Sequence, residues 1–250
     1  MRFENRPAII TGAASGMGLC ASQEMAKEGA IVYMVDVNEA RVTELAQEIV
    51  SAGGHAVPCP CDVRDFDQIQ AVVNKCLTDE GHVDIVINFA GGFPARMCGC
   101  KDGAFIHTPL DVLDWGIAVN FRAPMLFARA VMEPMMNQKK GVIINIGSIT
   151  GAEASCGDVA YATAKSGVMN GLTKSLALVG APYGVRCCCV SPGPVLTRDA
   201  MANMKTLLGR AAEPQEIVDL IMYLASDKAA FITGENILID GGRFIMKNKE

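Results

Sequence analysis

Seven short apolar runs recur along the chain, and they set the first expectation for its fold. Each has the length of a β-strand, and several are rich in Val and Ile. They are continuous and do not alternate with polar residues, which is typical of strands buried on both faces of a sheet. The seven predicted strands lie at residues 7–12, 30–36, 55–63, 83–91, 141–148, 185–193 and 236–242.

Longer segments with apolar positions at helical spacing separate these runs. The predicted helices cover residues 16–27, 39–52, 66–79, 110–136, 159–179 and 214–225. Strands that alternate with helices predict a doubly wound, parallel, seven-stranded α/β sheet of Rossmann-like type. No linker or repeat interrupts residues 1–250, so we expect one domain with its ligands at the carboxyl ends of the strands.

Charge and hydropathy exclude two classes of partner. The net charge is −5, and the only short basic tracts are Lys139-Lys140 and the tail around Lys247 and Lys249. This balance argues against a nucleic-acid-binding surface. There is no run of about eighteen apolar residues for a membrane span, and the N-terminus has no signal-peptide layout. We therefore expect a cytoplasmic protein with a small-molecule substrate.

The ten cysteines do not indicate a metal site. In a reducing compartment disulfides are rare, and none of the cysteines forms a C-x-x-C pair. The three histidines do not complete a ligand pattern either. The closest cysteines are Cys59 and Cys61, Cys98 and Cys100, and the run Cys187–Cys189. We interpret the cysteines as small hydrophobic residues and predict no metal.

A glycine-rich loop, TGAASGMG, follows the first predicted strand directly. Gly12, Gly16 and Gly18 suit a tight turn and a close backbone approach. The helix that begins there presents free N–H groups to a phosphate. Between the first strand and first helix of a βαβ unit, this pattern predicts a dinucleotide site that includes Ser15 and Met17.

Asp36 ends the second predicted strand, eighteen residues after Gly18. A carboxylate at this distance accepts hydrogen bonds from the adenosine ribose and repels a 2′-phosphate. Neither Val37 nor Ser15 is basic, so nothing nearby in the sequence would neutralise that phosphate. The predicted cofactor is NAD.

Tyr161 and Lys165 are four residues apart in VAYATAKSG and share one face if the segment is helical. A solvated polar face is the simpler explanation of this spacing alone.

Taken with the glycine loop, the chain resembles the short-chain dehydrogenase/reductase family over essentially its whole length. The motifs arrive in family order: the glycine loop, Asp36, CDV at 61–63, NFAG at 88–91, Asn120, Ser148, Tyr161, Lys165, PGPVLT at 192–197 and IDGG at 239–242.

The resemblance implies four catalytic residues. Tyr161 is similar to the acid/base that exchanges a proton with the substrate oxygen, and a neighbouring Lys165 ammonium would lower the pKa of its phenol. Ser148 resembles the serine that polarises the substrate carbonyl. Asn120 resembles the asparagine that holds a water for a proton relay through Lys165.

The resemblance also implies cofactor contacts, and it has two departures. The matching contact residues are Asp62, Val63, Asn88, Ala90, Gly91, Pro192, Gly193, Val195 and Thr197, together with Val37, Tyr161 and Lys165. The departures are Phe89 and Cys188, which stand where asparagine is common. They predict altered local packing in the sheet, away from the groups that move the proton.

The substrate pocket is expected from the loops after the fourth, fifth and sixth strands. Its candidate residues are Phe93, Met97, Ile149, Glu153, Met201 and Met204, with Arg96 and Arg198 as further polar candidates. Most are apolar, which favours a hydrophobic cyclic substrate such as a hydroxysteroid over a polyol or sugar. Residues 194–212 are interpreted as a substrate lid.

The resulting hypothesis is an NAD-dependent oxidoreductase of a secondary alcohol or ketone. The alternatives are a polyol or sugar dehydrogenase, a 3-oxoacyl carrier-protein reductase and a catalytically silent NAD-binding sensor. The helix at 110–136 is apolar and rich in methionine (Met125, Met132, Met135 and Met136), and family members commonly pair this helix across a two-fold axis. We therefore also predict a homotetramer.

Overall fold

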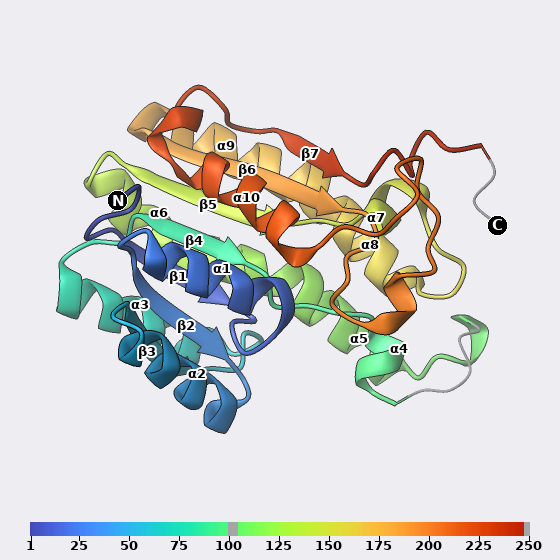
Figure 1. The fold of residues 1–250 in the computed structure, drawn as a ribbon, viewed down its shortest axis with the longest axis horizontal. Helices are drawn as coiled ribbons and strands as arrows, with labels where there is room; N and C mark the ends of the chain where they lie inside the picture. The colour runs from blue at the N-terminus through green and yellow to red at the C-terminus, as the bar shows by residue number, and fades with distance from the viewer. Residues whose placement is uncertain (100–104, 248–250) are drawn as a thin grey trace.

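The seven apolar runs pair in parallel to form one sheet, in the order β3-β2-β1-β4-β5-β6-β7 (Figure 1). The computed structural model describes residues 1–99 and 105–247. The strands are β1 (Pro7–Thr11), β2 (Ile31–Asp36), β3 (His55–Pro60), β4 (Ile85–Asn88), β5 (Gly141–Ile146), β6 (Val185–Pro192) and β7 (Asn236–Ile239). Each falls within a predicted run, which confirms the predicted fold class.

Helices connect the strands, and four of the six predicted helices agree with the structure to within one residue at each end. The helices are α1 (Gly16–Lys27), α2 (Glu39–Ser51), α3 (Phe66–Glu80), α4 (Pro94–Met97), α5 (Leu110–Ile117), α6 (Ala123–Asn137), α7 (Ile149–Glu153), α8 (Val159–Gly167), α9 (Thr173–Gly180) and α10 (Pro214–Ala225). Short 3-10 turns lie at Phe105–His107, Ala181–Tyr183, Asp199–Met201 and Asp227–Ala229. Within the described part of the chain, no helix is long and apolar enough to cross a bilayer.

Two hydrophobic layers hold the helices against the two faces of the sheet. Side chains of α1, α2 and α10 pack on one face, and those of α3, α6 and α9 pack on the other. In Figure 1 the strand arrowheads point to the end of the molecule where α4, α7 and α8 lie. Because β1 pairs with both β2 and β4, the chain reverses its direction of winding there, and a crevice forms outside these strand ends.

Two predicted long helices are each interrupted by a π-helical turn. Ala118–Arg122 separates α5 from α6, and Val168–Leu172 separates α8 from α9. Such turns are rare and often occur at functional sites. Sequence periodicity did not indicate either turn.

The methionines of the segment from α5 to α6 are only partly exposed. Met132 and Met135 are buried against the sheet, whereas Met125 is 40% exposed. Most of these methionines therefore pack in the core and do not form an exposed apolar surface. The homotetramer, which was expected from them, stays a prediction.

Six cysteines are buried, in agreement with their interpretation as small hydrophobic residues: Cys59, Cys61, Cys76, Cys187, Cys188 and Cys189. Cys98 and Cys156 are exposed, so the interpretation does not hold for them. Cys100 and Lys249 lie outside the described residues. Across residues 1–99 and 105–247, no group of three His, Cys, Asp or Glu side chains could hold a metal ion.

The segment 194–212 forms a loop with both ends held together. Val195 and Ala212 form a parallel bridge, and the Leu196 N–H donates to the Ala212 carbonyl over 2.8 Å. Within the loop, the Thr206 hydroxyl donates to the Arg210 carbonyl over 2.7 Å. A loop closed at its base can move as a unit. The interpretation of residues 194–212 as a lid stays a prediction.

Candidate active site

A cleft of about 570 Å³ lies at the carboxyl ends of the strands. Residues from the loops after the strands β1 to β6 line it, although they are far apart in the sequence. The predicted residues that it brings together are Gly12, Ser15, Gly16, Met17, Gly18, Asp36, Val37, Asp62, Val63, Ala90, Gly91, Phe93, Met97, Ser148, Ile149, Tyr161, Lys165, Pro192, Gly193, Val195, Thr197, Met201 and Met204.

Three predicted site residues do not line this cleft. Asn88 is buried in the sheet, where its Nδ2 donates to Asn145 Oδ1 over 2.9 Å. Glu153 forms an ion pair with Arg243, with Nε and Oε2 3.4 Å apart. Asn120 is fully buried behind the cleft wall. Asn88 and Asn120 can therefore affect a ligand only through the residues that they hold in place. The Glu153 carboxylate is paired with Arg243.

Asn120 holds the backbone of the loop after β4. Its Oδ1 accepts from the Gly92 N–H, and its Nδ2 donates to the carbonyls of Gly92 and Gly116, all over 3.0 Å. A Cβ on Gly91 would lie 2.6 Å from this Oδ1. Both amide protons are therefore used on the backbone, and only a free lone pair of Oδ1 remains for the predicted water.

The glycine loop forms a cradle that fits a dinucleotide phosphate. Gly12 has a φ of +67°, and a Cβ on Gly18 would overlap the Gly12 carbonyl oxygen. Side chains at these positions would fill the space and distort the turn. The N-terminus of α1, a twelve-residue helix, opens into the cleft beside the loop, and its free N–H groups favour an anion.

The Asp36 carboxylate is held at the end of β2. One oxygen accepts from the Ala14 N–H and the other from the Asn38 N–H, each over 3.0 Å. Both bonds come from backbone, so the carboxylate has a defined direction and keeps lone pairs for a ribose hydroxyl.

Arg64 also lines this end of the cleft, and sequence reasoning missed it. Its guanidinium pairs with Asp62 through contacts of 2.6–3.0 Å. The expectation that no basic residue lies near the ribose end is therefore incomplete, although the Asp62 charge balances this one. The arginine two residues after Asp62 in CDVR was the available signal.

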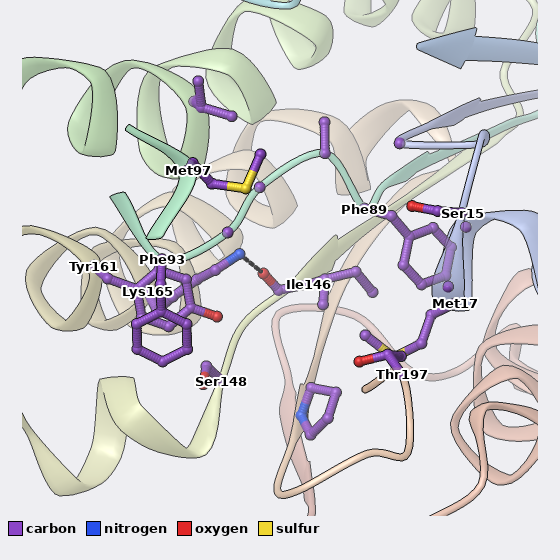
Figure 2. A pocket seen from close by; sticks show the side chains of 18 of the residues that line it. Ser15, Met17, Phe89, Phe93, Met97, Ile146, Ser148, Tyr161, Lys165 and Thr197 are labelled. Carbon is purple, nitrogen blue, oxygen red and sulfur yellow. Dashed lines mark hydrogen bonds between the residues drawn. The ribbon is translucent and has the colours of Figure 1, made fainter. Parts of the chain in front are cut away.

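The start of α8 sets the positions of Tyr161 and Lys165. Asp158 caps the helix by accepting from the Tyr161 N–H over 3.0 Å, so Tyr161 lies in the first turn and Lys165 one turn later. The Lys165 Nζ donates to the Ile146 carbonyl over 2.7 Å and lies 5.6 Å from the centre of the Tyr161 ring. Figure 2 shows both side chains pointing into the cleft.

Burial controls the ionisation of both groups. Burial lowers the pKa of the Lys165 ammonium to about 8, because the Ile146 carbonyl to which it donates is neutral and does not offset the loss of water. Burial also raises the pKa of the Tyr161 phenol, against weaker opposing effects of the Ser148 hydrogen bond and of the Arg198 and Arg96 charges. The expected lowering of the Tyr161 pKa by Lys165 is not among these effects and stays a prediction.

Ser148 stands between β5 and α7 and meets the phenol. Its hydroxyl oxygen accepts from the Thr150 N–H over 3.1 Å, which caps α7. The same hydroxyl lies close enough to the Tyr161 phenol to oppose the effect of burial on the pKa of that phenol. One substrate oxygen could therefore meet a serine hydroxyl and a tyrosine hydroxyl together.

The substrate end of the cleft contains an aromatic stack. The rings of Phe93 and Tyr161 are 4.3 Å apart and inclined by 22°. The Arg198 guanidinium lies 5.6 Å from the centre of the Phe93 ring. Trp115, which the sequence analysis did not single out, also lines the cleft.

Phe89 lies in the other half of the cleft, beside Ser15 and Met17 (Figure 2). It follows β4 and packs partly against the core on the α1 face. The predicted change in packing at this position therefore reaches the cofactor side of the cleft, away from Tyr161. Cys188, the second departure, is fully buried in β6.

Known proteins resemble this chain over nearly its whole length. A family model described as enoyl-(acyl carrier protein) reductase matches residues 12–243. A 7alpha-hydroxysteroid dehydrogenase of Bacteroides fragilis is 31% identical over 96% of this chain and 95% of its own. A 3-oxoacyl-[acyl-carrier-protein] reductase of Thermotoga maritima is 32% identical over 98% and 100%. A cyclopentanol dehydrogenase of Comamonas is 33% identical over 96% and 98%.

These matches, together with the parallel sheet and the cleft at its carboxyl edge, establish the family. The chain belongs to the short-chain dehydrogenase/reductase family and is an oxidoreductase of alcohols or ketones that uses a nicotinamide cofactor.

Proposed function

We propose that this enzyme transfers a hydride between NAD(H) and a hydrophobic cyclic secondary alcohol or ketone, with Tyr161, Ser148, Lys165 and Asn120 at its catalytic centre. The observation that carries this proposal is that the Ser148 hydroxyl lies close to the Tyr161 phenol. Both line the same cleft as the glycine loop and Asp36. A silent sensor would not require that arrangement of hydroxyl groups.

In the direction of oxidation, the Tyr161 phenolate takes the hydroxyl proton of the alcohol. A bound nicotinamide would supply the hydride acceptor for the carbon that carries this hydroxyl. Ser148 donates a hydrogen bond to the substrate oxygen and holds it near the phenol. Lys165 supplies a positive charge from the buried side of Tyr161, and Asn120 keeps the Gly92 backbone in place. In reduction Tyr161 returns the proton.

The preference for NAD rests on charge at the ribose end of the cleft. Asp36 presents a backbone-anchored carboxylate, and the single arginine that lines this end, within the described residues, is paired with Asp62. A 2′-phosphate would therefore meet a negative charge with no free cation. Steady-state kinetics with NAD and NADP test this directly, and equal or better efficiency with NADP would refute it.

The Arg64→Gln variant tests whether Arg64, in addition to Asp36, affects the choice between NAD and NADP. If Arg64 is neutralised by Asp62, this substitution should leave the ratio of NAD to NADP efficiency within about threefold of wild type. A large further loss of NADP activity would mean that Arg64 leaves Asp62 to bind the phosphate. Arg129→Gln, an exposed arginine on α6, serves as the control.

A hydrophobic cyclic substrate is supported by the apolar lining of the pocket. Phe93, Met97, Ile149, Met201 and Met204 all face the cleft, and burial of apolar surface contributes about 25 cal/mol per Å². The hydroxysteroid and cyclopentanol dehydrogenases among the relatives are named for cyclic substrates. Comparing kcat/KM for cyclic ketones and steroids with that for polyols tests the class, and a higher value for a polyol would contradict it.

Two further features belong to this proposal. Residues 194–212 act as a lid that brings Met201 and Met204 over the substrate. The chain assembles as a homotetramer, which is supported by exposed apolar side chains on α9, where Leu178 is 78% and Val179 52% exposed. Apolar side chains that stand together on a helix are typical of an interface.

A further inference from the structure

Two arginines enter the substrate half of the cleft without a carboxylate partner. Arg96 is on α4 and Arg198 is on the loop after β6, and both line the same cleft as Tyr161. Among residues 1–99 and 105–247, neither forms an ion pair within 4.0 Å. Their side-chain hydrogen bonds go to sulfur: Arg96 donates to Met97 Sδ over 3.8 Å and Arg198 to Met201 Sδ over 3.7 Å.

Thioether sulfur is a weak acceptor, so most of the N–H groups on these two guanidinium groups lack a strong partner. Two other shielded arginines have oxygen partners. Arg6 pairs with Asp84 over 3.2 Å, and Arg186 donates to backbone carbonyls, including that of Leu224 over 2.8 Å. Arg198, which is half-buried, differs from these two arginines because its side-chain hydrogen bond among the described residues goes to sulfur.

Phe93 connects Arg198 with Tyr161, the residue proposed to transfer the proton. Its guanidinium lies over Phe93 at 5.6 Å, and Phe93 stacks on Tyr161 at 4.3 Å. Arg198 is half-buried, and burial, followed by the charge of Arg96, lowers the pKa of its guanidinium. Two cations that disfavour each other in a partly shielded site are stabilised when an anion binds between them.

We propose that Arg96 and Arg198 bind a carboxylate of the substrate, so that the substrate is a hydrophobic cyclic hydroxy acid or keto acid. This inference rests on the proposed function and names its substrate class. The apolar residues Phe93, Met97, Met201 and Met204 cover the ring, and the arginines bind the acid group. The carboxylate sets which face and which carbon of the ring meets Tyr161.

Two other anions could meet these arginines. The cofactor pyrophosphate would be held at the glycine loop, whereas Arg198 lies over Phe93 on the substrate side. An acidic carrier protein would touch the rim of the cleft, where Arg96 is exposed. The half-buried Arg198 favours a small anion that enters the cleft, and both alternatives give distinct outcomes below.

The first experiment compares two ketones that differ only in charge. The probes are 4-oxocyclohexanecarboxylate and its neutral isostere 4-oxocyclohexanecarboxamide, reduced with NADH by the whole enzyme. We expect kcat/KM to favour the carboxylate by roughly ten- to a hundredfold, the range for hydrogen bonds to a charged group. The preference should fall at least fivefold in Arg198→Gln and further in Arg96→Gln/Arg198→Gln. Arg129→Gln, which removes another arginine that lies over a phenylalanine, should keep it.

The second experiment measures binding without turnover. Titration calorimetry of the same two probes into Tyr161→Phe with NADH should show the same preference, since Phe93 can still stack on phenylalanine. If charge preference appears here but no ketone is reduced by the wild type, the proposed function fails, and of this inference only the binding of a carboxylate by the two arginines stands. Binding of the carboxylate no tighter than that of the carboxamide overturns the inference.

Two further results also overturn it. One is weaker NADH binding in Arg198→Gln with an unchanged carboxylate preference, which would assign Arg198 to the cofactor. The other is efficient reduction of a 3-oxoacyl carrier protein that is lost in Arg96→Gln while the small probes show no charge preference, which would assign Arg96 to a protein surface.

Discussion

Replacing Lys165 with methionine should change how the stability of the protein depends on pH. Lys165 is 4% exposed, and its ammonium has one partner, the Ile146 carbonyl. Its pKa falls from 10.5 to about 8 in the folded protein. This difference corresponds to about 3 kcal/mol of unfavourable folding free energy when the lysine is protonated in both states.

The sign follows from proton binding in the two states. Below pH 8 the lysine is protonated whether folded or unfolded, and the whole penalty applies. Between pH 8 and 10.5 the unfolded chain binds more protons than the folded one, so the wild type gains stability as the pH rises. The methionine variant lacks this contribution, and the groups common to both proteins cancel in the difference.

Urea unfolding of both proteins at several pH values between 7 and 9.5 measures this effect. The free energy of unfolding of the wild type should rise by about 2 kcal/mol relative to Lys165→Met over this range. Losing the hydrogen bond to Ile146 shifts the variant by an amount that does not depend on pH. Lys174→Met, at an exposed position on α9, is the control. A constant difference between wild type and Lys165→Met would refute the reasoning, because Lys165 would then titrate alike in both states.

The remaining predictions concern catalysis, selectivity and assembly. Tyr161→Phe should reduce turnover by at least about a hundredfold with cofactor affinity nearly unchanged by NADH fluorescence titration; retention of more than a tenth of the activity would exclude Tyr161 as the proton carrier. Asp36→Ala should lower the ratio of NAD to NADP efficiency at least tenfold, and an unchanged ratio would show that the carboxylate does not face the ribose. Activity should survive dialysis against a chelator, whereas loss that zinc or magnesium restores would reveal a required metal. Light scattering at micromolar concentration should give four chain masses, and a monomer mass would contradict the tetramer.

Local chemistry explains why so much of the fold could be predicted. The continuous apolar runs of β1, β5 and β6 indicate strands buried on both faces, since each run carries its signal within a few residues. The bounds of α1 and α10 agree with the predicted residues, because their periodic apolar positions and, for α10, Pro214 in the first turn are local signals.

That most of the predicted site residues gather in one cleft could be predicted from the sequence as well. The carboxyl ends of parallel strands meet at one edge of a sheet, so residues that follow those strands gather there whatever their separation in sequence. Asp36 and Ser148 are examples. Glu153 follows a strand as well, yet it pairs with Arg243 from the end of the chain, a partner that no local pattern indicates.

The sequence by itself therefore determined the order of strands and helices along the chain, the parallel sheet and the set of groups near its edge. Only the tertiary structure decided how those groups meet. Lys165 donates to the Ile146 carbonyl, Arg64 pairs with Asp62, Asn120 holds the Gly92 backbone, and Arg198 lies over Phe93 with no carboxylate partner among residues 1–99 and 105–247. Hydrophobic patterning acts over a few residues and survives any side-chain arrangement. Ionisation and hydrogen bonding in the cleft depend on burial and on partners from distant segments, and these exist only after the chain has folded.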